Sequence, residues 1–237
     1  FGWFGFNAGS TLSVQLGGLG FFAYVALNTN LAAAAGVIGA VVTSWAVLKK
    51  PDLSMMLNGA IAALVAITAA CAFVEPWAAL VIGFGAGAIV VGGTRLVERA
   101  RIDDPVGCLA AHGMAGVWGT LALGFLTVPS LAEKLGTGQG GLLYTGSAAQ
   151  LGTQALGLLA VGAFTFGASF LVLWAMRATF GIRSDAEDEE AGLDVSEHGM
   201  WGYPEMFTPV PGGYGTDESN GRQLPLFRPG HAVPEPT

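Results

Sequence analysis

The stretch Asp103–Thr120, DDPVGCLAAHGMAGVWGT, places a single histidine, His112, inside a glycine-rich apolar run. Between Pro105 and Val128 there is no Asp, Glu, Lys or Arg, and a helix of about 20 apolar residues is long enough to cross the hydrocarbon core of a bilayer. An ionisable side chain at membrane depth is costly, so it indicates a function by default. The alternative is a histidine that hydrogen-bonds a neighbouring helix and has no other role.

The composition of the chain indicates an integral membrane protein. Hydrophobic residues make up 52% and charged residues 11%, whereas soluble domains carry about 25% charged residues. Only helices and closed barrels satisfy the backbone in lipid, and the runs lack the two-residue alternation of barrel strands. We therefore predict an all-α, polytopic membrane helix bundle. The charge-free runs are Phe1–Leu48, Leu53–Val74, Pro76–Thr94, Pro105–Ala132 and Leu135–Met176.

The net charge of −7 belongs to the tail of the chain. Residues 1–177 hold seven basic and six acidic residues, a balance of +1. Residues 178–237 hold three basic and eleven acidic residues, a balance of −8. Nothing in this distribution indicates a nucleic-acid partner.

The basic residues predict a topology. Positive-inside counting puts Lys49 and Lys50, the cluster Arg95–Arg101 and the tail on the cytoplasmic side, so Glu75 and Glu133 lie outside. Phe1–Ser10 is then the outer end of a preceding helix. The predicted spans are Phe21–Leu48, Leu53–Val74, Trp77–Thr94, Pro105–Val128 and Tyr144–Met176.

The fourth of these spans carries the candidate chemistry. We expect Pro105 in its first turn, just after Asp103 and Asp104, which favour a helix amino terminus. At 1.5 Å per residue, His112 then lies about 10 Å from the cytoplasmic end.

Helical spacing groups several small residues. Cys108, His112 and Ala115 or Gly116 share one face, which suits either a narrow, weakly polar lumen or a packed helix seam. We expect both cysteines of the chain, Cys71 and Cys108, to be free, buried thiols.

Glycine spacing predicts close helix packing. The residues concerned are the GxxxG pair Gly83 and Gly87, and the series Gly113, Gly116 and Gly119 on one narrow face.

The opening segment Phe1–Ser10 is dense in aromatic residues near the predicted outer surface. One interpretation is an interfacial aromatic belt. The other is a site for a small ammonium-type cation, which aromatic faces attract and whose proton the Ser10 hydroxyl can accept in a hydrogen bond.

Four motifs together resemble the ammonium transporter (Amt/Rh) family, and the Amt branch more than the Rh branch. The resemblance covers almost all of residues 1–205. The motifs are Gly2–Ser10, the pair Asn28-Thr29, Asp103–Gly107 leading to His112-Gly113, and the tail segment Ala191–Gly199.

The resemblance implies the ammonium transporter fold of eleven helices, with two inverted five-helix repeats followed by one long helix. This chain then corresponds to helices six to eleven, the second inverted repeat plus the long final helix, and lacks the amino-terminal half. It divides into a transmembrane domain (1–182), a cytoplasmic regulatory tail (183–206) and a tail expected to be disordered (207–237).

The resemblance also assigns site residues. Ser10 matches the hydroxyl of the outer ammonium recruitment site, and Phe6 matches one of two stacked phenylalanines that gate the pore. His112 matches the second of two hydrogen-bonded pore histidines. Cys108 takes the place of an apolar pore-lining residue, and Trp3 either lines the pore or only packs.

The implied function is transport of ammonium or ammonia through a hydrophobic pore, with deprotonation at the outer site and a histidine-lined lumen. Methylammonium is the expected analogue. The implied protein is a homotrimer in the inner or plasma membrane with a cytoplasmic carboxyl terminus, regulated by a PII-type nitrogen regulatory protein. Asp104 matches an acidic residue at the cytoplasmic mouth, and a structural role is the alternative for it.

Two other classes of function were compared with transport. An ammonium sensor would carry a signalling domain after the last helix, where about 55 residues are few for a domain. A membrane enzyme or redox subunit would need paired haem histidines, a cysteine cluster or a nucleophile constellation, so we expect no enzyme and no cofactor. His198 and His231 in the tail are given no metal or catalytic role.

Overall fold

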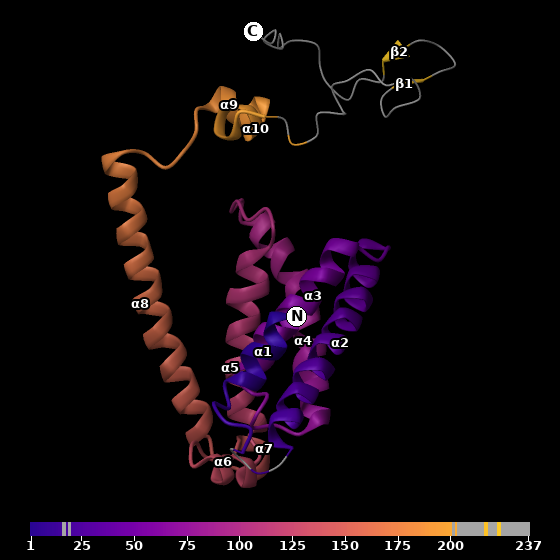
Figure 1. Ribbon diagram of the computed structural model, residues 1–237, viewed down its shortest axis with the longest axis vertical. Coiled ribbons are helices and arrows are strands. Elements are labelled where there is room, and N and C mark those ends of the chain that lie inside the picture. The colour runs from indigo at the N-terminus through magenta and orange to yellow at the C-terminus, as the bar shows by residue number, and fades with distance from the viewer. Residues whose placement is uncertain (16–17, 19, 201, 203–215, 218–221, 224–237) are drawn as a thin grey trace. The chain divides into compact units, whose positions relative to one another are not determined.

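The computed structural model describes residues 1–15, 18, 20–200, 202, 216–217 and 222–223. These residues form two units, 1–167 and 168–237, and one long helix runs from the first into the second. The helices of the first unit are α1 (Gly2–Gly9), α2 (Phe21–Leu48), α3 (Leu53–Thr68), α4 (Pro76–Arg99), the π-helix η1 (Leu109–Met114), α5 (Ala115–Leu126), α6 (Pro129–Leu135), α7 (Leu142–Thr145) and the start of α8 (Ala149–Thr179) (Figure 1).

The described chain has four helices long and apolar enough to cross a membrane, which are α2, α4, η1 with α5, and α8. The apolar helix α3 is shorter, at 16 residues. The all-α, multi-helix membrane class predicted from the charge-free runs is confirmed.

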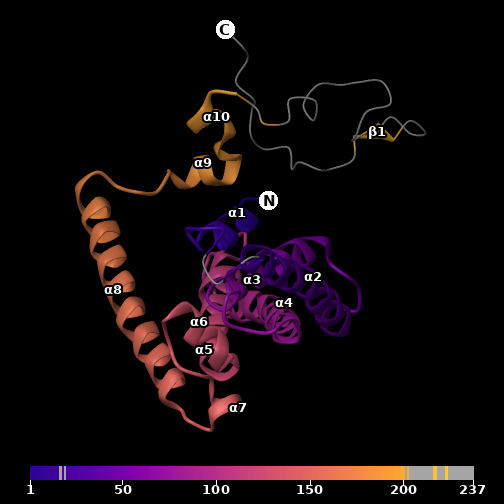
Figure 2. The ribbon, with the colours of Figure 1, turned by 60° about the horizontal axis from the view of Figure 1, so that its bottom comes forward.

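Helices α2, α3 and α4 lie side by side in both views of the ribbon (Figures 1 and 2). The predicted pair Gly83 and Gly87 lies in the seam between α4 and α2. A Cβ at Gly83 would collide with the Ala32 carbonyl oxygen, and one at Gly87 with that of Gly36. The GxxxG pair therefore allows backbone-to-backbone approach, as predicted.

The second glycine series behaves less uniformly. Only Gly119 abuts another backbone, because a Cβ there would collide with Ala66 of α3. A Cβ at Gly116 would meet only the Val65 side chain at 3.7 Å, and at Gly113 only Leu109 of its own turn at 3.1 Å. The expected common packing face is therefore wrong for Gly113.

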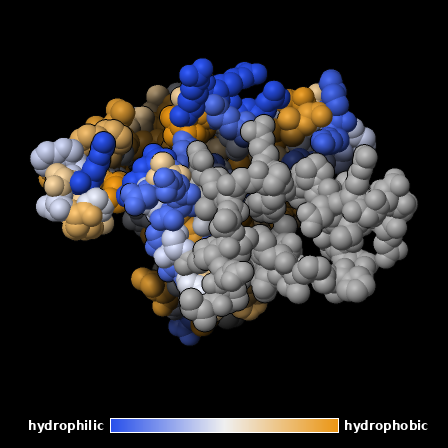
Figure 3. Space-filling view, turned by 90° about the horizontal axis from the view of Figure 1, so that it is seen from above, coloured by the Kyte–Doolittle hydropathy of each residue, from blue (hydrophilic) through white to orange (hydrophobic). Residues whose placement is uncertain are grey.

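The charged ends of the helices alternate as the topology predicts. Helices α2 and α4 run in one direction and α3 and α5 in the other (Figure 1). This puts Lys49 and Lys50 at the same end as Arg99, and Glu75 at the opposite end with α6. Figure 3 shows patches of hydrophilic residues on the face seen from above.

Helix α2 has the bounds predicted for it, whereas α3 ends at Thr68, six residues before the expected end. The residues that follow form turns whose carbonyl groups are held by α2. The Asn28 Nδ2 donates to the carbonyls of Cys71 and Val74, each at 2.9 Å, and the Tyr24 hydroxyl donates to Val74 at 2.7 Å. These side chains supply the partners that a continued helix would have supplied.

The last predicted span, Tyr144–Met176, is two helices. Gly146 ends α7 in the left-handed region, with φ of 71°. The Ser147 hydroxyl then accepts a hydrogen bond from the backbone N–H of Ala149, at 3.3 Å, where α8 starts. Glycine adopts this conformation at little cost, so Gly146 ends a helix inside a stretch that composition alone predicts to be one continuous span.

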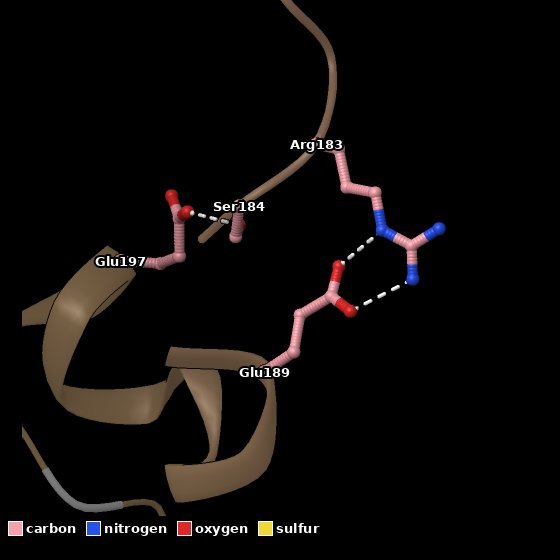
Figure 4. Close-up of polar contacts among 4 residues, drawn as sticks. All are labelled: Arg183, Ser184, Glu189 and Glu197. Carbon is pink, nitrogen blue, oxygen red and sulfur yellow. Dashed lines mark hydrogen bonds and ion pairs between the residues drawn. The ribbon is translucent and has the colours of Figure 1, made fainter. Parts of the chain in front are cut away.

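The second unit contains the rest of α8, the short helices α9 (Ala186–Ala191) and α10 (Leu193–His198), and the strands β1 (Thr216–Asp217) and β2 (Arg222–Gln223). Arg183 pairs with Glu189 through two bonds of 2.8 Å, and the Ser184 hydroxyl donates to Glu197 at 3.0 Å (Figure 4). The segment 183–200 therefore has local helical structure, while the described side chains of its charge run are mostly exposed.

The disorder expected for 207–237 falls mostly outside the described residues, as does His231. The four residues described in this segment pair as the antiparallel strands β1 and β2, with Thr216 opposite Gln223. The sequence analysis did not predict this pairing.

Candidate functional site

Helix α1 presents the three amino-terminal candidates at helical spacing. Trp3, Phe6 and Ser10 follow one another at intervals of three and four residues, which places them on one face. Ser10 caps the helix, and its hydroxyl donates to the Phe6 carbonyl at 2.6 Å. Because that bond uses the hydroxyl proton, the Ser10 oxygen is left as an acceptor. Phe6 is 61% exposed in this chain.

Trp3 joins α1 to the helix that carries His112. The two rings stack with centroids 6.4 Å apart and an interplanar angle of 27°. The Trp3 indole N–H donates to the Thr68 hydroxyl at 2.8 Å, and that hydroxyl donates to the Leu64 carbonyl at 2.6 Å. Thr68 thereby fixes the orientation of the indole that faces the histidine.

Asp104 holds the start of the histidine-bearing helix. Its two carboxylate oxygens accept from the backbone N–H groups of Cys108 and Leu109, at 2.8 and 2.9 Å. The helix starts there and not at Pro105, which lies in the preceding turn. Asp104 thus has a clear structural role as a capping residue.

The π-helical turn η1 changes the face on which the candidates lie. A π-helix holds more residues per turn than an α-helix, so spacing rules based on 3.6 residues fail across it. Cys108 and His112 are exposed in this chain, whereas Ala115 is fully buried. The prediction that Ala115 or Gly116 shares the face of Cys108 and His112 is therefore wrong for Ala115, whereas Gly116 is half-buried.

The two cysteines differ. Both are free, and Cys71 is buried as expected, but Cys108 is exposed. Cys108 precedes η1 on a side that no described element of this chain covers. The prediction of a buried Cys108 is therefore wrong for this chain.

The remaining motif residues make structural contacts. Asn7 donates through Nδ2 to the Thr29 hydroxyl at 3.1 Å, and Thr29 donates to the Val25 carbonyl at 2.8 Å. Asn28 holds the turn after α3. Asn7, Thr29 and Asn28 are all buried. The motifs that carried the resemblance thus join α1 to α2, and α2 to the turn after α3.

The structure brings Trp3 and His112 together, and it joins Ser10 to Phe6. Sequence reasoning did not find Thr68, because a threonine at the end of an apolar helix gives no signal of its role. Among the residues that the structure describes, no group of three or more metal-ligating side chains comes together.

The bundle of long apolar helices defines an integral membrane protein. A sequence model of the Ammonium Transporter Family matches residues 1–203, and the chain belongs to this family. It is a family of transporters and not of enzymes.

Individual relatives agree with this assignment. The chain is 43% identical over 209 residues to the ammonium transporter Amt2 of Archaeoglobus fulgidus, covering 86% of this chain and 43% of that protein. It is 37% identical over 204 residues to an ammonium transporter of Bacillus subtilis, covering 86% and 48%. The chain therefore spans less than half the length of these curated relatives.

Solved structures share the fold. A protein described as a sensor Amt protein matches with a TM-score of 0.72 and 35% identity, over 83% of this chain and 46% of that one. Saccharomyces cerevisiae Mep2 matches with a TM-score of 0.71 and 31% identity, over 79% of this chain and 42% of that one. The predicted ammonium transporter fold is confirmed.

Proposed function

We propose that the full-length protein transports ammonium or ammonia across the cell membrane, through a hydrophobic pore partly lined by these residues. The observations that carry the proposal are the Ser10 hydroxyl at the end of α1, bonded to the Phe6 carbonyl, and the Trp3 ring of the same helix, stacked on His112. Names of the relatives support ammonium as the transported ion.

The physical difficulty of this transport is the dehydration of a small cation. Moving a charge out of water costs several kcal/mol even after the protein relaxes. In the proposal, ammonium is recruited where the Ser10 oxygen can accept one of its N–H bonds and where aromatic faces favour a cation. It loses its proton near Phe6, and neutral ammonia continues, which avoids most of that cost.

His112 lines the lower part of this path. A neutral imidazole both donates and accepts a hydrogen bond, so it can solvate ammonia and pass a proton. The partner histidine and the second gating phenylalanine implied by the resemblance belong to the family's first five helices, outside these 237 residues. The proton follows a separate route along the histidines and water, which makes transport electrogenic. Cys108, one turn before His112, and Trp3 line the pore beside it.

The assembly proposed for the full-length protein is a homotrimer with cytoplasmic carboxyl termini. Residues 183–206 form a regulatory tail that contacts neighbouring subunits and a PII-type protein. The locally folded pairs of Arg183 with Glu189 and Ser184 with Glu197 support a defined tail structure.

Site variants of the full-length protein test the proposed roles. Uptake of labelled methylammonium is measured in cells that lack their own ammonium transporters. We expect Ser10→Ala and His112→Ala to reduce uptake or change ion selectivity, while the control Ser13→Ala leaves both unchanged. Normal uptake and selectivity in His112→Ala would refute the role of the histidine.

One observation favours a second function. The structural match described as a sensor Amt protein supports an ammonium receptor with a transporter-like membrane domain as the second candidate. A well-expressed full-length protein that binds ammonium without any uptake would support the sensor over the transporter.

A further inference from the structure

We infer that a side pocket behind Ser10 binds a small hydrogen-bond donor of one heavy atom, either water or ammonium, on the Oδ1 atom of Asn7. The pocket is a cavity of about 270 Å³ between α1, the end of α3 and the turn that follows it. Its lining includes Asn7, Thr11, Thr68, Cys71 and Ala72. This inference concerns binding and does not depend on transport.

The acceptor in this pocket is identified by the bonds around it. Asn7 is 3% exposed, and its Oδ1 has no hydrogen-bond partner among the described residues. The orientation of the Asn7 amide is fixed by Thr29. The Thr29 hydroxyl donates its proton to the Val25 carbonyl, so it must accept from the Asn7 amide. The amide therefore directs Nδ2 to Thr29, and the oxygen is the atom left over.

Buried polar atoms are almost always paired, through the protein or through ordered water. Asn28 also has an unpartnered Oδ1, but it does not line this cavity. Asn7 differs in having room beside it, since a water molecule in the liquid occupies about 30 Å³. The orphaned acceptor and the cavity are independent observations that indicate the same ligand.

The other polar groups of the lining set the chemistry of that ligand. The Thr11 hydroxyl donates to the Ala8 carbonyl at 2.8 Å, the Thr68 hydroxyl to Leu64, and the Cys71 thiol to the Thr68 carbonyl at 3.4 Å. Their protons are committed, so they offer lone pairs to the pocket. Water and ammonium, which donate hydrogen bonds, therefore match these three groups, while Thr137, which also lines the cavity, has a hydroxyl that can donate or accept.

The pocket also touches the proposed path. Thr68 lines the cavity and accepts the indole N–H of Trp3, and Ser10 lines the cavity at the end of α1. A molecule bound on Asn7 therefore lies directly behind the proposed outer recruitment site.

The test is the structure of the full-length protein at a resolution that shows ordered water, in ammonium-free buffer and with ammonium sulfate. A peak within hydrogen-bond distance of Asn7 Oδ1 in both conditions identifies water, and a peak only with the salt identifies ammonium. An empty cavity in both conditions overturns the inference.

Variants separate the acceptor from its surroundings. Asn7→Leu removes Oδ1, and Ala72→Leu places an apolar side chain in the cavity without removing a polar group, so each is expected to abolish the peak. Thr29→Ser keeps the hydroxyl that accepts from Nδ2 and therefore the orientation of Oδ1, so the peak is expected to stay. A peak that persists in Asn7→Leu or Ala72→Leu, or that vanishes in Thr29→Ser, contradicts the assignment. Ala72→Leu keeps the test valid if Asn7→Leu fails to fold.

Discussion

Replacing Thr68 by valine tests whether the stack of Trp3 on His112 contributes to transport. Valine has nearly the shape of threonine but cannot accept the indole N–H that Thr68 holds at 2.8 Å. The perturbation therefore leaves the helix and its packing in place and releases only the orientation of the indole, whose centroid lies 6.4 Å from that of His112.

The expected size follows from the one hydrogen bond lost. Such a bond contributes a net of about 0.5–1.5 kcal/mol, and about 1.4 kcal/mol is a factor of ten in an equilibrium. The stacked arrangement should become less populated by about two- to tenfold. We expect the maximal rate of methylammonium uptake by the full-length protein to fall by a similar factor. The half-saturating concentration should change less, because Ser10 is untouched.

The matched control is Thr68→Ser, which keeps the hydroxyl acceptor and should transport almost normally. Uptake is measured against methylammonium concentration at equal membrane expression of the three proteins. If Thr68→Val and Thr68→Ser show the same maximal rate as the parent, then the indole orientation does not matter and the reasoning is refuted.

Three further outcomes follow from the structure. Asp104→Ala removes the cap at the start of η1 and should destabilise the full-length protein by about 0.5–2 kcal/mol in thermal unfolding in detergent. Asp104→Asn should be closer to the parent, and equal melting temperatures of all three proteins would contradict the capping role. Gly83→Leu forces a side chain into the α2 backbone and should lower the free energy of unfolding by about 1–3 kcal/mol or more. Gly92→Leu should not, because the space that its Cβ would occupy is open, and equal effects of the two variants would argue against the close seam. The hydrogen bond from the Arg183 guanidinium holds the pKa of Glu189 below its usual value. The ion pair therefore stabilises the tail fully at a pH above the usual pKa of glutamate, and this stabilisation is lost as the pH falls through the lowered pKa of Glu189. The protection factors of the tail amides, which correct for the intrinsic pH dependence of exchange, should fall on acidification in the parent and change less in Arg183→Gln. Protection factors that stay equal in acid would exclude the contribution.

Much of the fold could be predicted because the relevant signals are local. The charges at Lys49 and Lys50 end α2 where expected, and the spacing of Gly83 and Gly87 predicts the close seam. The end of α3 could not be predicted, since the side chains that hold the following turn come from Asn28 and Tyr24, more than 40 residues earlier in the chain. Only the tertiary structure brings them to that turn.

The site was predictable in its residues and less so in its geometry. Trp3 and His112 were both candidates, yet nothing in the sequence indicates that their rings stack or that Thr68 orients one of them. The π-helical turn was the main error, because every spacing argument from Cys108 to Ala115 assumed 3.6 residues per turn. A wider turn in the middle of an apolar run leaves no signal in composition.

The most direct test of the proposed function is uptake of labelled methylammonium by the purified full-length protein in proteoliposomes. The account predicts saturable uptake that unlabelled ammonium competes away, and that sodium and potassium do not. Absence of uptake by a correctly folded, well-incorporated protein, or uptake indifferent to ammonium, would contradict it.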